Sequence, residues 1–304
     1  MIQIGSGPVN QYLLTNEAFY CTDKNSWKWN LLYLNNIPQT SPTGRFCLEQ
    51  SWYLGADMQC FLLALPVVYL LSRKLSIGLI VSSFVILSSM ILKAVQADYY
   101  QAQPMAFIHG NWDQRDNSTH KYFSNSYQNT FMRIDVYFLG LLFGVLIRYL
   151  KDGKLRILLN LNIPLQLLGW SICTFLMVGA LLGPHSWYEH EFSQSFSSFF
   201  QATFRLAWSI GLGWIIFVAE FDYCQPLRWF LSLKIWNFIS KLSYGIYLIH
   251  IYIYFLYYYQ TRQAIYFTHL NLFTIYVAVF SIATLVAFVL HLTIEIPVKL
   301  LIDR

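Results

Sequence analysis

The sequence has few charged residues. Only 12% of its 304 residues are Asp, Glu, Lys or Arg, whereas 56% are hydrophobic and 18% are aromatic. An ordinary water-soluble domain carries about 25% charged residues. Half of that share is too small to cover a surface that faces water, whereas a lipid bilayer accepts an apolar exterior. The composition therefore predicts an integral membrane protein that has the lipid bilayer as a partner.

The sequence also lacks the common motifs of soluble enzymes. It has no G-x-S-x-G, no P-loop, no H-E-x-x-H and no C-x-x-C, so neither a metal nor a nucleotide is predicted from motifs. The net charge is only +5, and the Lys and Arg residues are scattered in short clusters. This distribution argues against a nucleic-acid partner. Since no repeat, linker or low-complexity tract divides the chain, one membrane domain is the simplest organisation.

Cysteine is scarce and occurs in an odd number. The five cysteines are Cys21, Cys47, Cys60, Cys173 and Cys224. Cys60 and Cys173 lie inside apolar runs and Cys224 lies two residues after one, whereas Cys21 and Cys47 lie in the polar N-terminal segment. A disulfide between them is plausible if their segment lies in an oxidising compartment, and two free thiols are the alternative.

Long apolar runs are abundant. A helix needs about 20 mainly apolar residues to cross the hydrocarbon layer, because its backbone polar groups must be satisfied internally. Seven runs qualify: 55–72, 76–96, 134–150, 163–182, 202–222, 238–258 and 272–296. We predict an all-α, polytopic bundle of about seven transmembrane helices. It would comprise an outer N-terminal segment, 1–54, and a transmembrane domain, 55–304.

Basic residues cluster in alternate connections between the runs. The clusters are Arg73 and Lys74; Arg148, Lys151, Lys154 and Arg156; Arg228, Lys234 and Lys241; and Lys299 and Arg304. Because basic loops stay in the cytoplasm, segment 1–54 is predicted outside and the C-terminus inside. A glycosylation sequon at Asn117, in an outer loop, agrees with this orientation. We expect a multi-pass protein of the plasma membrane or the endoplasmic reticulum.

The start of the chain has no segment that would carry residues 1–54 across a membrane. Met1 is followed by neither a basic region nor an apolar region of the kind found in signal peptides. We therefore expect that the sequence begins partway through a longer protein.

Polar residues follow one side of the sixth run. Ser243, Tyr247, His250 and Tyr254 are spaced by four, three and four residues, so they share a helix face. A polar group near the middle of a bilayer is costly unless it has a partner, so this face should point into the bundle. His250 is either a neutral histidine satisfied by a neighbouring helix or part of a substrate cavity.

Other ionisable residues lie in or beside the runs. His291 and Glu295 share a face of the last helix and could hydrogen-bond each other or a polar cavity. Asp57 is a further cavity candidate, and Arg205 could pair with an acid or hold an anionic ligand. Three more lie near run ends, where snorkelling to the interface is expected: Lys93, Arg133 and Asp135.

Two G-x-x-x-G patterns suggest close helix packing. They are Gly140 with Gly144 and Gly179 with Gly183. Small residues at this spacing let neighbouring helices approach closely.

Three stretches in a fixed order carry a family resemblance. The first is Asn30-Leu31-Leu32-Tyr33-Leu34-Asn35-Asn36, which Cys21, Trp27 and Trp29 precede and Cys47 follows. The second is Trp52-Tyr53-Leu54-Gly55-Ala56-Asp57-Met58-Gln59, and the third is Ser243-Tyr244-Gly245-Ile246-Tyr247-Leu248-Ile249-His250. Together they resemble the acyltransferase 3 membrane family, specifically its animal branch of nose-resistant-to-fluoxetine-like proteins. Trp29, Gln50 and Ala56 depart from the family pattern.

The resemblance implies an O-acyltransferase that passes an acyl group from acyl-CoA to an acceptor that the sequence does not identify. It also places Cys21 and Cys47 on the outer side. The histidine and arginines linked to acyl transfer in bacterial members lie in early spans that nothing here matches. The catalytic residues are therefore unknown, and we expect no turnover from residues 1–304 alone.

Two other functions remain possible at this stage. A non-enzymatic transporter of lipids or small molecules would also place polar residues such as His250 and Glu295 inside spans. A seven-helix receptor fits the span count and the outer N-terminus. Its usual marks are lacking, because Ile147 stands before Arg148-Tyr149 and no N-P-x-x-Y ends the last helix.

Overall fold

The computed structural model describes residues 26–37, 49–102, 126–154, 161–185, 193–263, 266 and 268–302. All regular secondary structure within these ranges is helical, which confirms the all-α prediction. The chain divides into two compact units. The large unit comprises Lys28–Gly44 and Trp52–Arg228, and the C-terminal unit comprises Met1–Trp27, Arg45–Ser51 and Trp229–Arg304. The proposed boundary between segment 1–54 and the transmembrane domain stays a prediction.

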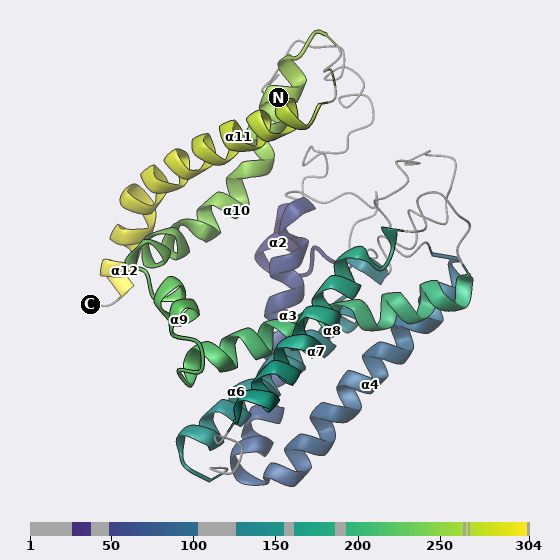
Figure 1. Ribbon diagram of the computed structural model, residues 1–304. Helices are drawn as coiled ribbons and strands as arrows, with labels where there is room; N and C mark the ends of the chain where they lie inside the picture. Colours follow the sequence, from purple (N-terminus) through teal and green to yellow (C-terminus); the bar gives the residue numbers. More distant parts are fainter. Residues whose placement is uncertain are drawn as a thin grey trace. The chain divides into compact units, whose positions relative to one another are not determined.

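The large unit is built around five long helices (Figure 1). They are α3 (Trp52–Arg73), α4 (Leu75–Tyr99), α6 (Ile134–Lys151), α7 (Ile163–Leu182) and α8 (Gln194–Glu220). Short helices at its margins are α2 (Ser26–Leu31), η4 (Thr130–Met132) and α9 (Gln225–Leu231), which runs into the C-terminal unit. Helix α4 packs against α3, α6 and α8, and α7 packs against α8.

Small and aliphatic side chains form the contact between α3 and α6. Cys60, Ala64, Val67 and Leu71 are spaced by four, three and four residues, so they form one face of α3. This face packs with Phe138, which is 1% exposed on α6. The same contact fixes the first turn of α6, where several residues of the site described below are found.

The C-terminal unit is a helical hairpin. Helices α10 (Lys234–Gln260) and α11 (His269–Leu290) lie side by side and run in opposite directions (Figure 1). They approach closely at Gly245, where an added Cβ would lie 3.0 Å from the Cβ of Ala287. The remaining helices of this unit are η2 (Glu49–Ser51), the π-helical turn η7 (His291–Glu295) and α12 (Ile296–Ile302).

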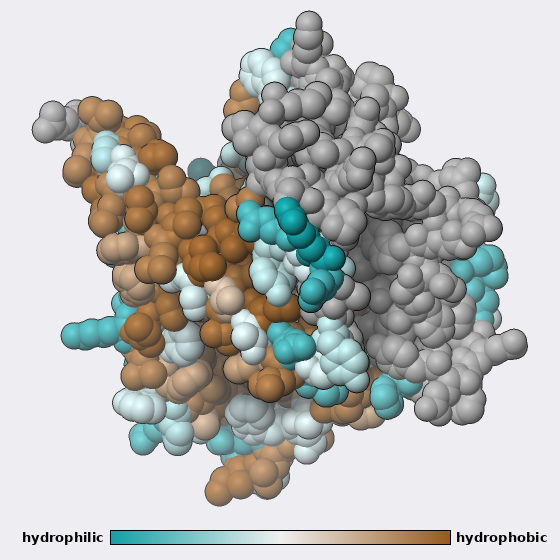
Figure 2. Space-filling view, turned by 90° about the horizontal axis from the view of Figure 1, so that it is seen from above, coloured by the Kyte–Doolittle hydropathy of each residue, from teal (hydrophilic) through white to brown (hydrophobic). Residues whose placement is uncertain are grey.

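Large apolar side chains cover much of the described surface. Phe84, Phe175 and Leu285 are 70%, 77% and 67% exposed, and they belong to three different long helices. On the face shown in Figure 2, apolar residues form broad continuous areas and hydrophilic residues are scattered. A soluble monomer rarely exposes such areas. The surface therefore fits surroundings of lipid.

Six helices of the described chain are long and apolar enough to cross a membrane. They are Trp52–Arg73, Leu75–Tyr99, Ile163–Leu182, Gln194–Glu220, Lys234–Tyr258 and His269–Ile302. Helix α6 forms at the remaining predicted run, and it carries three charged residues in 18. The prediction of a polytopic bundle with about seven spans is thus confirmed.

The largest difference in helix boundaries is at α8. The apolar run predicts a start at residue 202, but the helix begins at Gln194. The added turns carry polar residues that are used inside the protein. The Oγ of Ser197 donates to the carbonyl of Ala102 (2.6 Å), and Nε2 of Gln194 donates to the carbonyl of Ala97 (2.9 Å). Hydropathy alone missed these turns because their polar groups are satisfied by protein.

The packing role predicted for three of the G-x-x-x-G glycines is wrong. A Cβ added to Gly140, Gly144 or Gly179 would meet no atom within 4 Å in the described structure. Close approach occurs instead at other glycines. A Cβ on Gly169 of α7 would lie 2.1 Å from the ring of Trp214 on α8, so that contact requires glycine.

Candidate functional site

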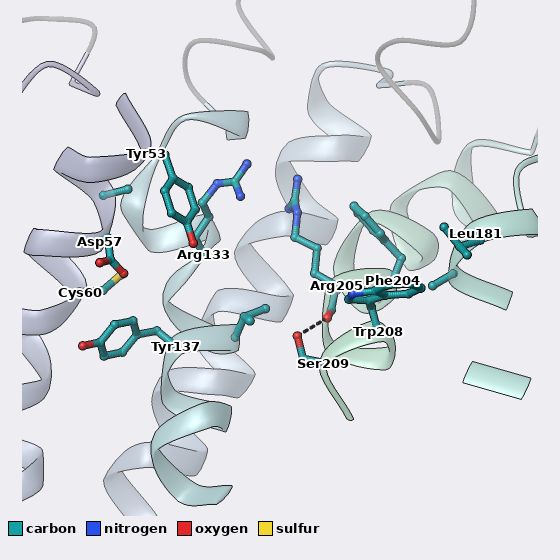
Figure 3. A pocket seen from close by; sticks show the side chains of 13 residues that line it. Tyr53, Asp57, Cys60, Arg133, Tyr137, Leu181, Phe204, Arg205, Trp208 and Ser209 are labelled. Atoms are coloured by element: carbon teal, nitrogen blue, oxygen red, sulfur yellow. Dashed lines mark hydrogen bonds between the residues drawn. The ribbon is translucent and has the colours of Figure 1, made fainter. Parts of the chain in front are cut away.

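An open pocket of about 390 Å³ lies among α3, α6, α7 and α8 of the large unit (Figure 3). Its volume is in the range of small-molecule sites, which typically combine apolar walls with a few polar groups. The labelled lining residues are Tyr53, Asp57 and Cys60 on α3; Arg133 and Tyr137 at the start of α6; Leu181 on α7; and Phe204, Arg205, Trp208 and Ser209 on α8. The structure thus brings together two sequence-predicted residues, Asp57 and Arg205, and adds Arg133.

The guanidinium of Arg133 is held by aromatic rings. Its Cζ lies 4.4 Å from the ring centre of Trp52 and 4.7 Å from that of Tyr127. Its Nε donates to the carbonyl of Tyr127 (3.1 Å). Within the described chain, the terminal Nη donors make no hydrogen bond. Arg133 is therefore fixed in place while its strongest donors stay available.

Arg205 brings a second positive charge toward the same ring. Its Cζ lies 5.6 Å from the ring centre of Tyr127 and 4.8 Å from that of Phe204. Ser209 donates to the carbonyl of Arg205 (2.8 Å), a bond inside α8. Two guanidinium groups next to one ring give this end of the pocket a positive potential.

Asp57 supplies the negative charge of the pocket. Its side chain is exposed, and it makes no hydrogen bond or ion pair with any described residue. It lies one turn after Tyr53 on α3, and Figure 3 shows both of them with Cys60 on the same side of the pocket. Asp57 and Arg133 therefore line one pocket without neutralising each other.

A closed ring of hydrogen bonds fixes the motif segments next to the pocket. The Oγ1 of Thr130 donates to Oε1 of Gln59 (2.5 Å), and Nε2 of Gln59 donates to Oδ1 of Asn36 (2.7 Å). The Nδ2 of Asn36 completes the ring by donating to Oγ1 of Thr130 (2.8 Å). Gly55 permits this arrangement, because an added Cβ would lie 2.8 Å from Oδ1 of Asn35.

Sequence reasoning treated Asn36 and Gln59 as family markers and missed their pairing. The Asn35-Asn36 dipeptide was a detectable signal, because both side chains are almost completely buried although they lie outside every apolar run. Their bonds join segment 26–37 to the first turns of α3, which carry Tyr53 and Asp57. We infer that these motifs position the wall of the pocket.

A buried ion pair lies between α4 and α6. Lys93 and Asp135 are 4% and 0% exposed, and Nζ of Lys93 donates to Oδ2 of Asp135. The expectation that these residues snorkel to the interface is wrong, because each finds its partner inside the bundle. The second carboxylate oxygen, Oδ1, is buried and has no hydrogen-bond partner within the described chain.

His250 lies in the C-terminal unit and hydrogen-bonds within its own helix. Its Nδ1 is 2.8 Å from the carbonyl oxygen of Tyr247 and 3.2 Å from that of Ile246. Because carbonyl oxygens only accept, Nδ1 must carry the proton, and Nε2 is the acceptor in the neutral ring. No described residue bonds to Nε2. Its place in a substrate cavity stays a prediction, and it does not line the pocket of the large unit.

The neighbours of His250 on the predicted stripe also bond to backbone. Tyr247 donates its hydroxyl to the carbonyl of Gln50, and Nε2 of Gln50 donates to the carbonyl of Leu248 (3.4 Å). Ser243 donates to the carbonyl of Ser240 (2.8 Å). These bonds attach η2 to α10 inside the C-terminal unit.

Of the two alternatives for His291 and Glu295, the hydrogen bond to each other is present, and their place in a polar cavity stays a prediction. Nδ1 of His291 lies 2.6 Å from Oε2 of Glu295. The two residues begin and end the π-helical turn η7, in which the N–H of Ile296 donates to the carbonyl of His291. Helix α12 follows, with Pro297 at its second position. Since proline has no N–H to continue an α-helical ladder, a change of helix type here has a physical cause.

Three residues with predicted modifications lie outside the described residues. Cys21, Cys47 and Asn117 are outside the described residues, so the disulfide and the glycosylation stay predictions. Among the described residues, no group of three or more His, Cys, Asp or Glu side chains could hold a metal ion.

Comparison with known proteins gives two matches. A family model for acyltransferase 3, described as an acyltransferase domain, matches residues 9–292. Nose resistant to fluoxetine protein 6 of Caenorhabditis elegans is 25% identical to the chain over 234 residues. That match covers 74% of this chain and 28% of the nematode protein, so the chain corresponds to about a quarter of the relative. No solved structure matches the chain.

The matched residues extend into both units and include every described residue that lines the pocket. The family resemblance of the motif stretches is therefore confirmed. The stretch 52–59 contributes Tyr53 and Asp57 to the pocket and is bonded to the stretch 30–36 through Asn36, whereas the stretch 243–250 belongs to the C-terminal unit. With most of its length matched by the family model, this membrane-spanning chain belongs to the acyltransferase 3 family.

Proposed function

We propose that this protein takes part in O-acyl transfer at a membrane, from an acyl-CoA donor to an acceptor hydroxyl, and that the large-unit pocket holds the acceptor. In this reaction the acceptor oxygen bonds to the acyl carbon, the thioester C–S bond breaks, and the hydroxyl proton ends on the coenzyme A thiol. The observation that carries the proposal is an open pocket of about 390 Å³ with apolar walls and available charged groups, inside an acyltransferase domain.

The charged groups suit the binding of an acceptor. The Nη donors of Arg133 can hold an oxygen or an anionic group, because the guanidinium is already immobilised by its ring contacts. The carboxylate of Asp57 can accept a hydrogen bond from a hydroxyl or ammonium group. The aromatic and aliphatic walls formed by Phe204, Trp208 and Leu181 can cover an apolar body.

The described residues that line the pocket include charged and aromatic binding groups but no histidine. Histidine is the side chain most often used as a general base. Of the described histidines, His250, His269 and His291 belong to the C-terminal unit. We therefore propose that residues 1–304 bind substrate without turning it over.

Acyl transfer can be measured with radiolabelled acyl-CoA and a membrane lipid extract as the source of acceptors. We expect labelled ester from the full-length gene product and none from purified residues 1–304. Labelled ester from the purified chain would overturn the proposed inactivity. The absence of labelled ester from the full-length product, across donor chain lengths, would overturn the acyltransferase proposal.

Arg133→Gln tests the assignment of the pocket. In the full-length product we expect the apparent KM for the acceptor to rise about tenfold or more, because a charge-assisted contact is lost. Arg73→Gln is the matched control, since Arg73 is exposed at the opposite end of α3. An unchanged KM for the acceptor in Arg133→Gln, or an equal change of KM in Arg73→Gln, would mean that the acceptor does not bind in this pocket.

A second candidate is a non-enzymatic transporter of lipids or small molecules. The combination of available charges with no lining histidine favours it, because binding without a base is sufficient for transport. Uptake of a labelled lipid by cells that express the full-length gene, without formation of an ester, would support this function. Equal uptake by cells expressing Arg133→Gln would count against this pocket as the route.

We further propose that the pocket end of the large unit faces the outside or the lumen. The support is the basic turn at Arg73 and Lys74, which is at the opposite end of α3 from Asp57. Labelling of single cysteines introduced at Lys74 and at Ser118 should occur from opposite sides of the membrane. Labelling of both from the same side would contradict the orientation, and glycosidase treatment would test Asn117 independently.

A further inference from the structure

The pocket of the large unit holds opposite charges that do not pair with each other. Asp57 and Arg133 both line it, and no ion pair joins them or links either one to another described residue. Asp57 is exposed and Arg133 is half-buried, so a ligand in the pocket can reach both charges without first breaking an ion pair. This arrangement suits a ligand that carries a positive and a negative group.

Contacts within the large unit hold the two groups in place. The guanidinium of Arg133 contacts the rings of both Trp52 and Tyr127, which also contact each other, and its Nε donates to the carbonyl of Tyr127. Asp57 is fixed on α3, whose first turns are joined to segment 26–37 by the bond between Gln59 and Asn36. These contacts immobilise Arg133 without using its Nη donors, and no ion pair joins it to Asp57 in the described chain.

One end of the pocket suits an anionic group. The guanidinium groups of Arg133 and Arg205 approach the ring of Tyr127 at 4.7 and 5.6 Å. Guanidinium donors match phosphate and carboxylate oxygens in geometry as well as in charge. In Figure 3 both arginine side chains extend toward the same end of the pocket.

The other side of the pocket suits a cationic group. Asp57 has no ion pair within the described chain, and the rings of Tyr53 and Tyr137 lie on the two sides of it in Figure 3. Tyr53 precedes Asp57 by one helical turn. Aromatic faces next to a carboxylate are the usual setting in which proteins bind a substituted ammonium ion.

We propose that the pocket binds a zwitterionic amphiphile. Its phosphate lies at Arg133 and Arg205, its substituted ammonium lies at Asp57 between Tyr53 and Tyr137, and its chain extends along the apolar wall that includes Trp208. This inference rests on the proposed function in one respect. If the pocket holds the acceptor, the zwitterionic amphiphile is the chemical class of that acceptor. A membrane lipid head group and a soluble phosphocholine-type metabolite share this chemistry.

Binding can be measured on the whole chain in an uncharged maltoside detergent with tritiated hexadecylphosphocholine. The competitors carry the same hexadecyl chain with one charge or none: hexadecyl phosphate, hexadecyltrimethylammonium and hexadecanol. We expect the zwitterion to compete at least about tenfold better than each of the other three, because each lacks a charge-assisted contact. Equal competition by all four would mean that only the apolar chain is recognised, and it would overturn the proposal.

A further arm distinguishes the two sources of the ligand. Phosphocholine without a chain should compete at least about tenfold more weakly than hexadecylphosphocholine if the ligand comes from the membrane, because the apolar wall is left uncovered. Equal competition by phosphocholine would show that a soluble ligand is bound, and it would overturn the amphiphile part of the proposal.

Two variants assign the charges within the pocket. Asp57→Asn should remove the advantage of the zwitterion over hexadecyl phosphate, and Arg133→Gln should remove its advantage over hexadecyltrimethylammonium. The matched controls are Asp98→Asn and Arg73→Gln, which change exposed residues outside the pocket. A uniform loss of affinity for every probe, or the same loss in the controls, would contradict the assignment. The preference of the unchanged protein for the zwitterion is measured without any variant, so it tests the proposal even if a variant misfolds.

The outcome is separable from that of the proposed acyl transfer. Zwitterion-selective binding without ester formation by the full-length product would leave the ligand class standing and remove the enzyme proposal. Ester formation on a neutral acceptor, together with no preference for the zwitterion in binding, would support the enzyme proposal and remove the proposed ligand class.

Discussion

Replacing Asp135 with leucine should destabilise the protein more than replacing Asp135 and Lys93 together. In the single variant Asp135→Leu, the ammonium of Lys93, which is 4% exposed, loses the one hydrogen-bond partner that it has within the described chain. In the double variant with Lys93→Met, two apolar side chains of similar size occupy the same space. The double variant also removes the carboxylate oxygen that has no partner within the described chain.

The expected magnitude follows from the burial of both charges. In soluble proteins, removing one partner of a buried ion pair costs about 3–5 kcal/mol, whereas apolar replacement of both is often neutral or stabilising. Polar contacts in a bilayer are worth less, because the unfolded helices also find partners. We therefore expect a loss of about 2–3 kcal/mol in the free energy of unfolding for Asp135→Leu, and at most about 1 kcal/mol for the double variant.

A double-mutant cycle provides the measurement. The free energy of unfolding is determined in mixed detergent micelles with increasing SDS for the unchanged protein, both single variants and the double variant. The ion pair of Lys151 with Glu220 is the matched control, because its side chains are 56% and 40% exposed and an exposed pair contributes little. A double variant as unstable as Asp135→Leu, or an equal loss from Lys151→Met, would refute the reasoning.

Substitutions at Gly169, Thr130 and Gly55 test the packing. Gly169→Ala should lower the unfolding free energy by about 1–3 kcal/mol because its Cβ would overlap the ring of Trp214, whereas Gly140→Ala, with open space, should be neutral or stabilising in the same SDS titration. Thr130→Val should cost about 1–3 kcal/mol by opening the hydrogen-bond ring, and Thr130→Ser should retain most of the stability; equal losses would contradict the role of the hydroxyl. Gly55→Ala should expose the segment that carries Asn36 to limited proteolysis, and unchanged cleavage kinetics would argue against the close contact.

The positions of the helices could be predicted from hydropathy because a bilayer imposes length and apolarity on each span. The run 163–182 coincides with α7, and the turn at Arg73 and Lys74 separates α3 from α4. The prediction is least accurate where polar residues face protein instead of water. The first turns of α8 show this, since Ser197 and Gln201 are buried but read as loop residues in a hydropathy scan.

The site was predicted only in part for a related reason. Asp57 and Arg205 could be singled out because ionisable residues inside spans are rare. Nothing in their sequence positions, 148 residues apart, indicates that one pocket contains both. Arg133 was set aside as an interfacial residue, although its ring contacts fix its positive charge in the pocket. Such contacts depend on how helices pack, which periodicity does not encode.

The sequence by itself determined the helical membrane architecture and the family. It also showed which polar residues lie inside spans, because the chain contains so few charged residues. The tertiary structure decided which of these residues meet: Lys93 pairs with Asp135, whereas Asp57 and Arg133 line one pocket without an ion pair to any described residue. The physical reason is that hydropathy measures the preference of each segment for its surroundings, whereas pairing depends on distances between side chains on different helices. Those distances are fixed by close contacts such as that of Gly55 with Asn35.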